Sequence, residues 1–92
     1  MSMRQHQLQI QLRDQEGAVL RALGLIERRG FRLDSLHVGE PGGDGRSMQV
    51  SVSSVRAGDL LKRQLERLQD VMWVELRPPA MKLAGRPETI KT

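Results

Sequence analysis

The chain has 92 residues, a formal net charge of +4 and no cysteine. That length allows one small domain, and such domains bury only about 60% of the surface of their unfolded chain, so they often pair with a copy or a partner. The lack of cysteine excludes disulfides, zinc ribbons and thiol chemistry. No apolar run approaches the roughly 20 residues that span a bilayer, and no signal segment is visible at the start. We therefore expect a cytoplasmic protein.

The positive charge suggests nucleic-acid binding, but two features weaken that interpretation. Half of the net charge lies beyond Arg77, in residues 78–92. Proteins that bind single strands stack bases on aromatic side chains, and the aromatic residues here are only Phe31 and Trp73. A basic RNA-contacting domain therefore remains a minor alternative.

The first part of the chain predicts a strand, a turn and a helix. Residues 6–13 alternate leucine or isoleucine with glutamine, which is the period of two of a half-buried strand. A polar turn follows, and from Ala18 the apolar spacing becomes helical. We expect Asp14 or Gln15 to cap this helix. Gly30 suits the position after its end, because glycine accepts the left-handed conformation required there.

Residues 31–39 predict a second strand whose alternation breaks. Phe31 and Leu33 point one way, whereas Leu36 and Val38 point the other. Either a bulge intervenes, or both faces of the strand are partly covered. The glycine-rich stretch that follows predicts a hairpin connection. It opens no helix, so it is not expected to be a phosphate-binding loop.

The remaining elements complete a βαββαβ order. Residues 48–53 alternate as a third strand, residues 57–68 have a helical stripe of leucines, and residues 72–76 predict a fourth strand that ends before two prolines. We expect an α+β, ferredoxin-like domain over residues 1–77, with a four-stranded antiparallel sheet and two helices on one face. We expect residues 78–92 to form a disordered tail.

Few residues indicate chemistry. His6 and His37 lie at no spacing typical of a catalytic triad or a metal site, so we interpret both as ordinary strand residues and predict no catalytic residue and no metal. An acylphosphatase-like enzyme of this fold would need an asparagine to position water, and the chain has none. The helix-borne basic residues are interpreted as solvated charges: Arg28, Arg29, Arg56, Lys62, Arg63 and Arg67.

Trp73 has the opposite parity to Met72, Val74 and Leu76, so it is expected on the open sheet face or at an edge. Tryptophan is enriched at the centres of protein interfaces. We therefore predict an interface that includes Leu36, Val38, Val71 and Trp73.

Four segments together resemble an ACT domain, and more narrowly the small regulatory subunit of acetolactate synthase (acetohydroxyacid synthase). They are LRDQEGAVL at residues 12–20, ERRGF at 27–31, DSLHV at 34–38 and QLERLQDV at 64–71. The likeness covers roughly residues 6–77, and its pattern is a turn ending in glycine, an apolar helix, Arg-Gly-aromatic and a Ser-Leu-x-Val strand.

This resemblance implies a non-catalytic subunit without a cofactor of its own. It would activate a large catalytic subunit that carries thiamine diphosphate, magnesium and FAD, and it would in many cases confer sensitivity to valine or another branched-chain amino acid. ACT domains typically form homodimers side by side, with the effector between the first turn and the partner's second strand. The implied effector site here is Asp14, Gln15, Glu16, Gly17 and Ala18, with Arg32 opposite.

Two positions depart from valine-sensitive relatives, which tend to have asparagine where this chain has Asp14 and Arg32. An asparagine amide can donate to an effector carboxylate, whereas an ionised aspartate only accepts and would repel it. Activation is therefore better supported than feedback inhibition. The alternative is a free-standing ACT domain that senses an amino acid for another enzyme or regulator.

Overall fold

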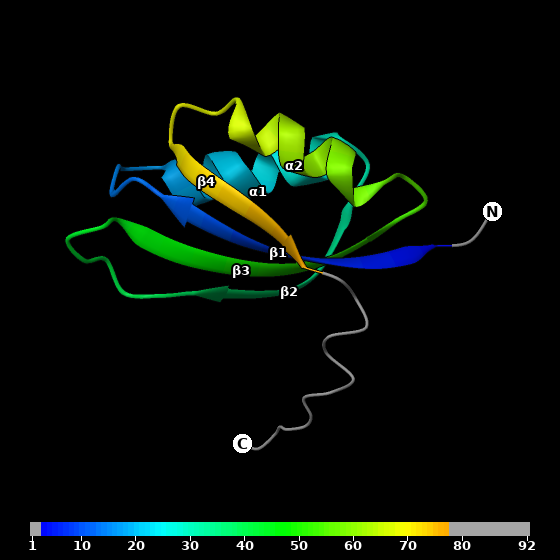
Figure 1. Cartoon of the computed structure of the whole chain (residues 1–92), viewed down its shortest axis with the longest axis horizontal. Coiled ribbons are helices and arrows are strands. Elements are labelled where there is room, and N and C mark those ends of the chain that lie inside the picture. The colour runs from blue at the N-terminus through cyan, green and yellow to red at the C-terminus, as the bar shows by residue number, and fades with distance from the viewer. Residues whose placement is uncertain (1–2, 78–92) are drawn as a thin grey trace, which may run out of the picture.

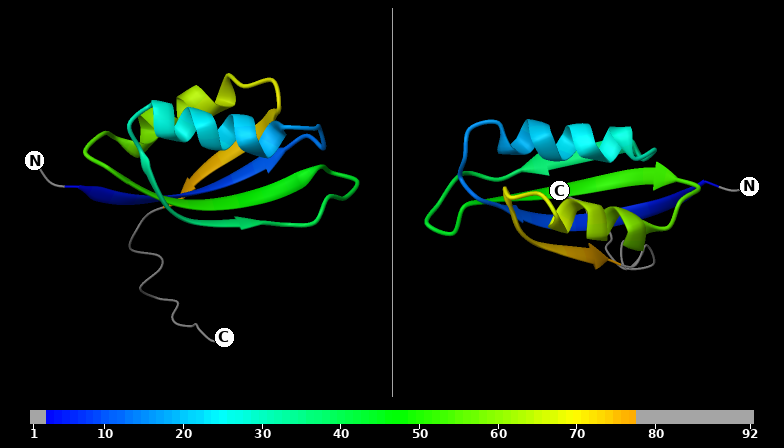
Figure 2. Two further views of the ribbon diagram at one scale, coloured as in Figure 1. Left: turned by 180° about the vertical axis from the view of Figure 1, so that it is seen from behind. Right: turned by 90° about the horizontal axis from the view of Figure 1, so that it is seen from above.

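Strands and helices alternate in the computed structural model, which describes residues 3–77. The elements are β1 (Arg4–Leu12), α1 (Ala18–Arg28), β2 (Arg32–Val38), β3 (Arg46–Ser54), α2 (Gly58–Glu66) and β4 (Val71–Arg77). All strand pairs are antiparallel, in the order β2-β3-β1-β4. Both helices cover one face of the sheet and leave the other open (Figures 1 and 2). The ferredoxin-like expectation is confirmed, while the expected tail lies outside the described residues.

The core lies between the helices and the inner face of the sheet. On the central strand β1, Leu8, Ile10 and Leu12 are each at most 2% exposed, and the glutamines between them face the open side. The buried stripe of α1, which includes Ala22 and Ile26, packs against this face. Burying one large aliphatic side chain contributes about 1.5–3 kcal/mol, so this alternation is what fixes β1 in its register.

The two ends of α1 follow different rules. The expectation that Asp14 or Gln15 caps its start is wrong, because Gly17 occupies the cap position and no side chain bonds there. At the other end, the Gly30 amide donates to the Glu27 carbonyl oxygen (3.1 Å), and the amide of the next residue reaches back to the last turn. Gly30 has φ +88°, as the sequence predicted. This paired arrangement satisfies carbonyl groups that a helix end otherwise leaves free.

A bulge explains the broken alternation of β2. Its pairing with β3 shifts between Leu33 and Ser35, so Asp34 is the extra residue. The Asp34 carboxylate accepts hydrogen bonds from the Ser53 hydroxyl and from Arg32 Nε. The Ser53 bond is the main cause that lowers the pKa of Asp34, with Arg32 adding to it. The bulge returns Leu33 and Leu36 to the same, helix-covered side of the sheet.

A second irregularity corrects the expected faces of β4. Leu12 pairs with Val71 and Gln11 with Trp73, which leaves Met72 as the extra residue. Met72 is therefore exposed rather than sharing the inner face with Val74, and Val71 is buried. No helix within residues 3–77 combines the length and apolar character that crossing a membrane requires.

Candidate functional site

The connection between β1 and α1 is held by its backbone against the turn before β4. The Arg13 amide donates to the Asp70 carbonyl oxygen at 2.7 Å, the Gln15 amide to the Arg13 carbonyl oxygen at 2.8 Å, and the Ala18 amide to the Gln15 carbonyl oxygen at 3.1 Å. The loop is thus a tight turn joined to the end of the α2–β4 connection. Its shape is set by residues from both halves of the chain.

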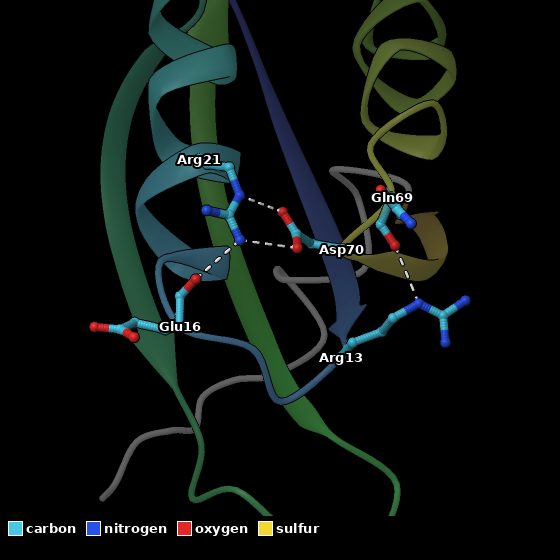
Figure 3. A network of polar contacts seen from close by, with 5 residues as sticks. All are labelled: Arg13, Glu16, Arg21, Gln69 and Asp70. Atoms are coloured by element: carbon cyan, nitrogen blue, oxygen red, sulfur yellow. Dashed lines mark hydrogen bonds and ion pairs between the residues drawn. The ribbon is translucent and has the colours of Figure 1, made fainter.

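Side chains reinforce the same junction (Figure 3). The Arg21 guanidinium donates twice to the Asp70 carboxylate, from Nε at 2.6 Å and from Nη2 at 3.0 Å. The same Nη2 also donates to the Glu16 carbonyl oxygen at 2.9 Å. From the other side, Arg13 Nε donates to the Gln69 carbonyl oxygen at 3.0 Å. Two arginines therefore anchor the loop, one at each end.

The Arg21–Asp70 ion pair is partly exposed to solvent. The Asp70 side chain is 12% exposed and that of Arg21 is 51% exposed. The hydrogen bond from Arg21 lowers the pKa of Asp70, against the opposing effect of burial, and the charge of Arg13 acts in the same direction as Arg21. The same bond raises the pKa of Arg21. Both groups are charged at neutral pH, and their bidentate geometry is the strongest that such a pair adopts.

The β2–β3 hairpin lies beside the β1–α1 loop. Gln11 Nε2 donates to the Asp44 carbonyl oxygen at 2.6 Å, and Gly45 lies directly against the Leu12 carbonyl group. A hollow of about 330 Å³ lies between the hairpin and Arg13, Asp14 and Gln15. A second hollow, of about 440 Å³, lies on the side of Arg21 and Asp70. The loop thus has open space on both sides.

The structure places the predicted effector residues in two groups. Asp14, Gln15 and Glu16 are exposed on the loop, Gly17 is half-buried, and Ala18 is buried at the start of α1. Arg32 is at the opposite end of the sheet, in the row of Ser53 and Gln5. At about 3.3 Å per residue along β1, that row is about 20 Å from the loop. One chain alone therefore does not bring Arg32 to Asp14.

The four predicted interface residues do not share one surface. Val71 belongs to the core, at 7% exposure, because the β4 bulge turns it inward. Trp73 is 46% exposed on the open face of β4, at one edge of the sheet. Leu36 and Val38 lie on β2, the other edge, and on the helix-covered side. Any interface would use these edges separately.

Sequence reasoning missed the anchoring residues. Arg21 and Asp70 are 49 positions apart, and the spacing of apolar residues gives no indication that they pair. The one available signal was Asp70, which lies within the segment that resembles ACT domains. Within residues 3–77, no three histidine, aspartate or glutamate side chains gather as metal ligands.

An antiparallel sheet with two helices on one face, and a turn anchored before the first helix, define a ferredoxin-like domain. A family model described as an ACT domain matches residues 14–74, and this chain belongs to the ACT domain family. Domains of this family are regulatory rather than catalytic, and they often form regulatory subunits that dimerise and pair with catalytic enzymes. No curated protein sequence matches the chain.

Solved structures of similar fold come from several enzymes. The ACT domain of GTP pyrophosphokinase from Chlorobium tepidum has a TM-score of 0.68 at 18% identity, over 83% of this chain and 100% of that one. The acetolactate synthase small subunit from Thermotoga maritima has a TM-score of 0.67 at 24% identity, over 83% of this chain and 48% of that one. The aspartate kinase regulatory subunit from Thermus thermophilus has a TM-score of 0.61 at 22% identity, over 84% of this chain and 54% of that one. The chain thus spans about half of each of the last two, and the likeness is one of fold.

Proposed function

We propose that this chain is the activating, non-catalytic small subunit of acetolactate synthase, acting in branched-chain amino acid biosynthesis. The observation that carries the proposal is the run of residues 12–38, which resembles these small subunits and which forms the anchored loop, α1 and β2. The fold of the Thermotoga maritima small subunit supports it. The catalytic partner would hold thiamine diphosphate, magnesium and FAD, and this chain would supply a surface that favours the active arrangement of that partner.

The effector site of this proposal needs two copies of the chain. Strand β2 is an edge strand of the sheet, so its outer side is open to pairing with a second β2. In an antiparallel pair centred near Ser35, the start of β2 in one copy, which carries Arg32, lies near the end of β2 in the other, which carries Val38. Val38 shares a row with Ile10, close to the end of β1. This pairing carries Arg32 to the same end of the sheet as the loop of the other copy.

The residues of the loop favour activation with little valine inhibition. The exposed carboxylates of Asp14 and Glu16 can pair with an effector ammonium, but they repel a carboxylate placed at the start of α1. Within the chain, Arg32 Nε is already bonded to Asp34 at 3.1 Å. An effector carboxylate would have to compete for it. A coupled inhibitory site requires recognition of both charged groups of the amino acid.

Reconstitution with an acetolactate synthase large subunit tests the proposal. The full chain is expected to raise the rate of acetolactate formation, and titration with valine, leucine or isoleucine is expected to lower the stimulated rate only weakly. If no matching large subunit is stimulated, the acetolactate synthase assignment is wrong. Half-inhibition at sub-millimolar valine would refute the expectation of weak inhibition. If this inhibition is lost in Arg32→Ala but kept in the control Arg63→Ala, on the outer side of α2, the effector site is assigned to Arg32.

A second candidate is a free-standing ACT amino-acid sensor for another enzyme or regulator. It is supported by the similarity of fold to the ACT domain of GTP pyrophosphokinase, which shows that this fold also serves enzymes other than acetolactate synthase. In this case the purified chain binds an amino acid without stimulating any acetolactate synthase. Isothermal titration calorimetry with the free amino acids, together with the stimulation assay above, distinguishes the two functions: binding without stimulation assigns the sensor.

A further inference from the structure

Three arginines surround a hollow at the corner where α1 ends and α2 begins. The hollow has a volume of about 230 Å³ and is lined by Arg28, Arg29, Arg56, Leu60 and Gln64. It lies at the end of the helix layer opposite to the β1–α1 loop, since α1 runs away from that loop. It is therefore separate from the effector site considered above.

The backbone at this corner is fixed by buried polar groups. The Ser54 hydroxyl donates to the Gly30 carbonyl oxygen at 2.8 Å and accepts from the Arg56 amide at 3.0 Å. The ring of His6 bonds through Nε2 to the Arg56 carbonyl oxygen at 3.1 Å. Ser54 is 2% exposed and His6 is 8% exposed. The Arg56 side chain thus extends from a rigid backbone. Its guanidinium group lies over Gly30, and Arg56 Nε is 3.0 Å from where a Cβ on Gly30 would be.

Arg28 reaches the hollow from α1. Its Nη1 lies 3.2 Å from where a Cβ of Gly24 would be, so its guanidinium lies back along the helix by one turn. Arg21, Gly24 and Arg28 follow the spacing of one helix face. At one end of this face Arg21 meets the carboxylate of Asp70. At the other end Arg28 lines the hollow together with Leu60 and Gln64, neither of which carries a charge.

The arginines of the hollow have no acidic partner inside the described part of the chain. None of Arg28, Arg29 and Arg56 lies within 4.0 Å of a carboxylate oxygen in residues 3–77. Asp59, in the first turn of α2, is directed toward Arg63 at 3.7 Å. Three like charges that share a hollow repel one another, and an anion bound between them would relieve this repulsion.

We propose that Arg28, Arg29 and Arg56 form a binding site for a small ligand that carries a diphosphate group. Guanidinium groups form planar, paired hydrogen bonds to phosphate oxygens, and a diphosphate has enough oxygens and negative charge to engage all three. Leu60 offers an apolar contact and Gln64 a polar contact for an organic part attached to the diphosphate. The arginines at the C-terminus of α1 also complement the helix dipole, so the test must separate binding from stability.

Calorimetric titration of the full chain with potassium pyrophosphate, at constant ionic strength, is the experiment. We expect saturable one-site binding that Arg56→Gln and Arg28→Gln each weaken about tenfold. Arg63→Gln is the matched control, because it removes one arginine charge from α2 outside the hollow, and it is expected to change the affinity less than about twofold. Amide shifts in two-dimensional NMR spectra are expected to be confined to residues 28–30 and 54–64, and circular dichroism confirms that each variant is folded.

A parallel titration with a nucleoside diphosphate identifies the source of the ligand. Tighter binding than pyrophosphate assigns an organic diphosphate, and equal binding assigns the inorganic ion. The proposal is overturned if binding does not saturate by about 10 mM pyrophosphate, which corresponds to a negligible affinity. It is also overturned if Arg63→Gln weakens binding as much as Arg56→Gln, or if single-stranded RNA displaces pyrophosphate with a steep dependence on salt.

Discussion

Arg21 and Asp70 determine how the loop between β1 and α1 is held. Their two hydrogen bonds join the second turn of α1 to the residue just before β4, and the third bond of Arg21 fixes the Glu16 carbonyl group. The loop needs this support because the side chains of Asp14 and Gln15, which were expected to cap the helix, face solvent. The ion pair holds the loop in place, although no side chain caps the amides at the start of α1.

Replacing Asp70 with asparagine is expected to lower the melting temperature by a few degrees at pH 7. The pKa of Asp70 is lowered in the folded chain, relative to about 3.9 in an unfolded one. Its charge therefore stabilises the fold above that value, and this stabilisation is lost as the pH falls through the lower, folded pKa. The difference between wild type and Asp70→Asn should shrink as the pH falls from 5 to 3, measured by thermal unfolding.

Asp44→Asn serves as the control, since the Asp44 side chain is exposed in the hairpin, and it should melt with the wild type at every pH. A deficit of Asp70→Asn that stays constant down to pH 3 would show that hydrogen-bond geometry, rather than charge, explains the loss.

The location of the β1–α1 loop could be predicted from the sequence, but the residues that anchor it could not. The segment from Leu12 to Leu20 resembles the ACT family strongly enough to locate the turn. The contact between Arg21 and Asp70 joins residues far apart in the chain, and periodicity carries no information about such a pair. Arg32 was assigned to the site by resemblance, and its place about 20 Å away along the sheet follows from strand register, which becomes visible only in the structure.

At the scale of elements, helices and strands were predictable wherever one face is buried. The alternation of Leu8 and Ile10 with glutamine fixed β1, and the apolar stripe of α1 fixed its start at Ala18. The bulges at Asp34 and Met72 were the difficult points. A bulge inserts one residue and exchanges the two faces from there on, so Met72 was assigned to the core, while the break in β2 left two explanations open.

The hairpin between β2 and β3 is also an element whose role the sequence did not reveal. Gly45→Ala is expected to destabilise the fold by at least about 2 kcal/mol. Gly45 has φ +95°, and a Cβ there would collide with the Leu12 carbonyl oxygen. Urea unfolding measures the change in the free energy of unfolding.

Gly43→Ala is the matched control within the same hairpin. A Cβ on Gly43 meets no atom within 4 Å, so its effect should be less than about 0.5 kcal/mol. Equal effects of the two substitutions would mean that the hairpin does not lie against β1 in solution.

At the scale of the whole molecule, the free edge of β2 predicts self-association. Leu36 on β2 and Val55 in the β3–α2 connection are almost equally exposed, at 41% and 42%. If two copies pair through β2, Leu36→Lys places a charge beside its symmetric equivalent and should shift the protein toward monomer at micromolar concentration. Val55→Lys should leave the dimer unchanged, as measured by light scattering.

A wild-type chain that is monomeric at all concentrations tested would contradict this prediction. A dimer that resists Leu36→Lys but shows a blue-shifted, protected Trp73 fluorescence would instead assign the interface to the open face of the sheet. On that face Trp73 lies beside Gln11 of the neighbouring strand β1.

The strand order β2-β3-β1-β4 also has a consequence for when the protein folds relative to its synthesis. The strand made first, β1, lies between β3 and β4, so its last partner is completed only at Arg77. Synthesis proceeds from the N-terminus, and a nascent chain that stops before Val71 has β1 with one side bare. We therefore expect this domain to fold after its synthesis rather than during it, and a message truncated before β4 to yield a substrate for chaperones and proteases instead of a smaller folded protein.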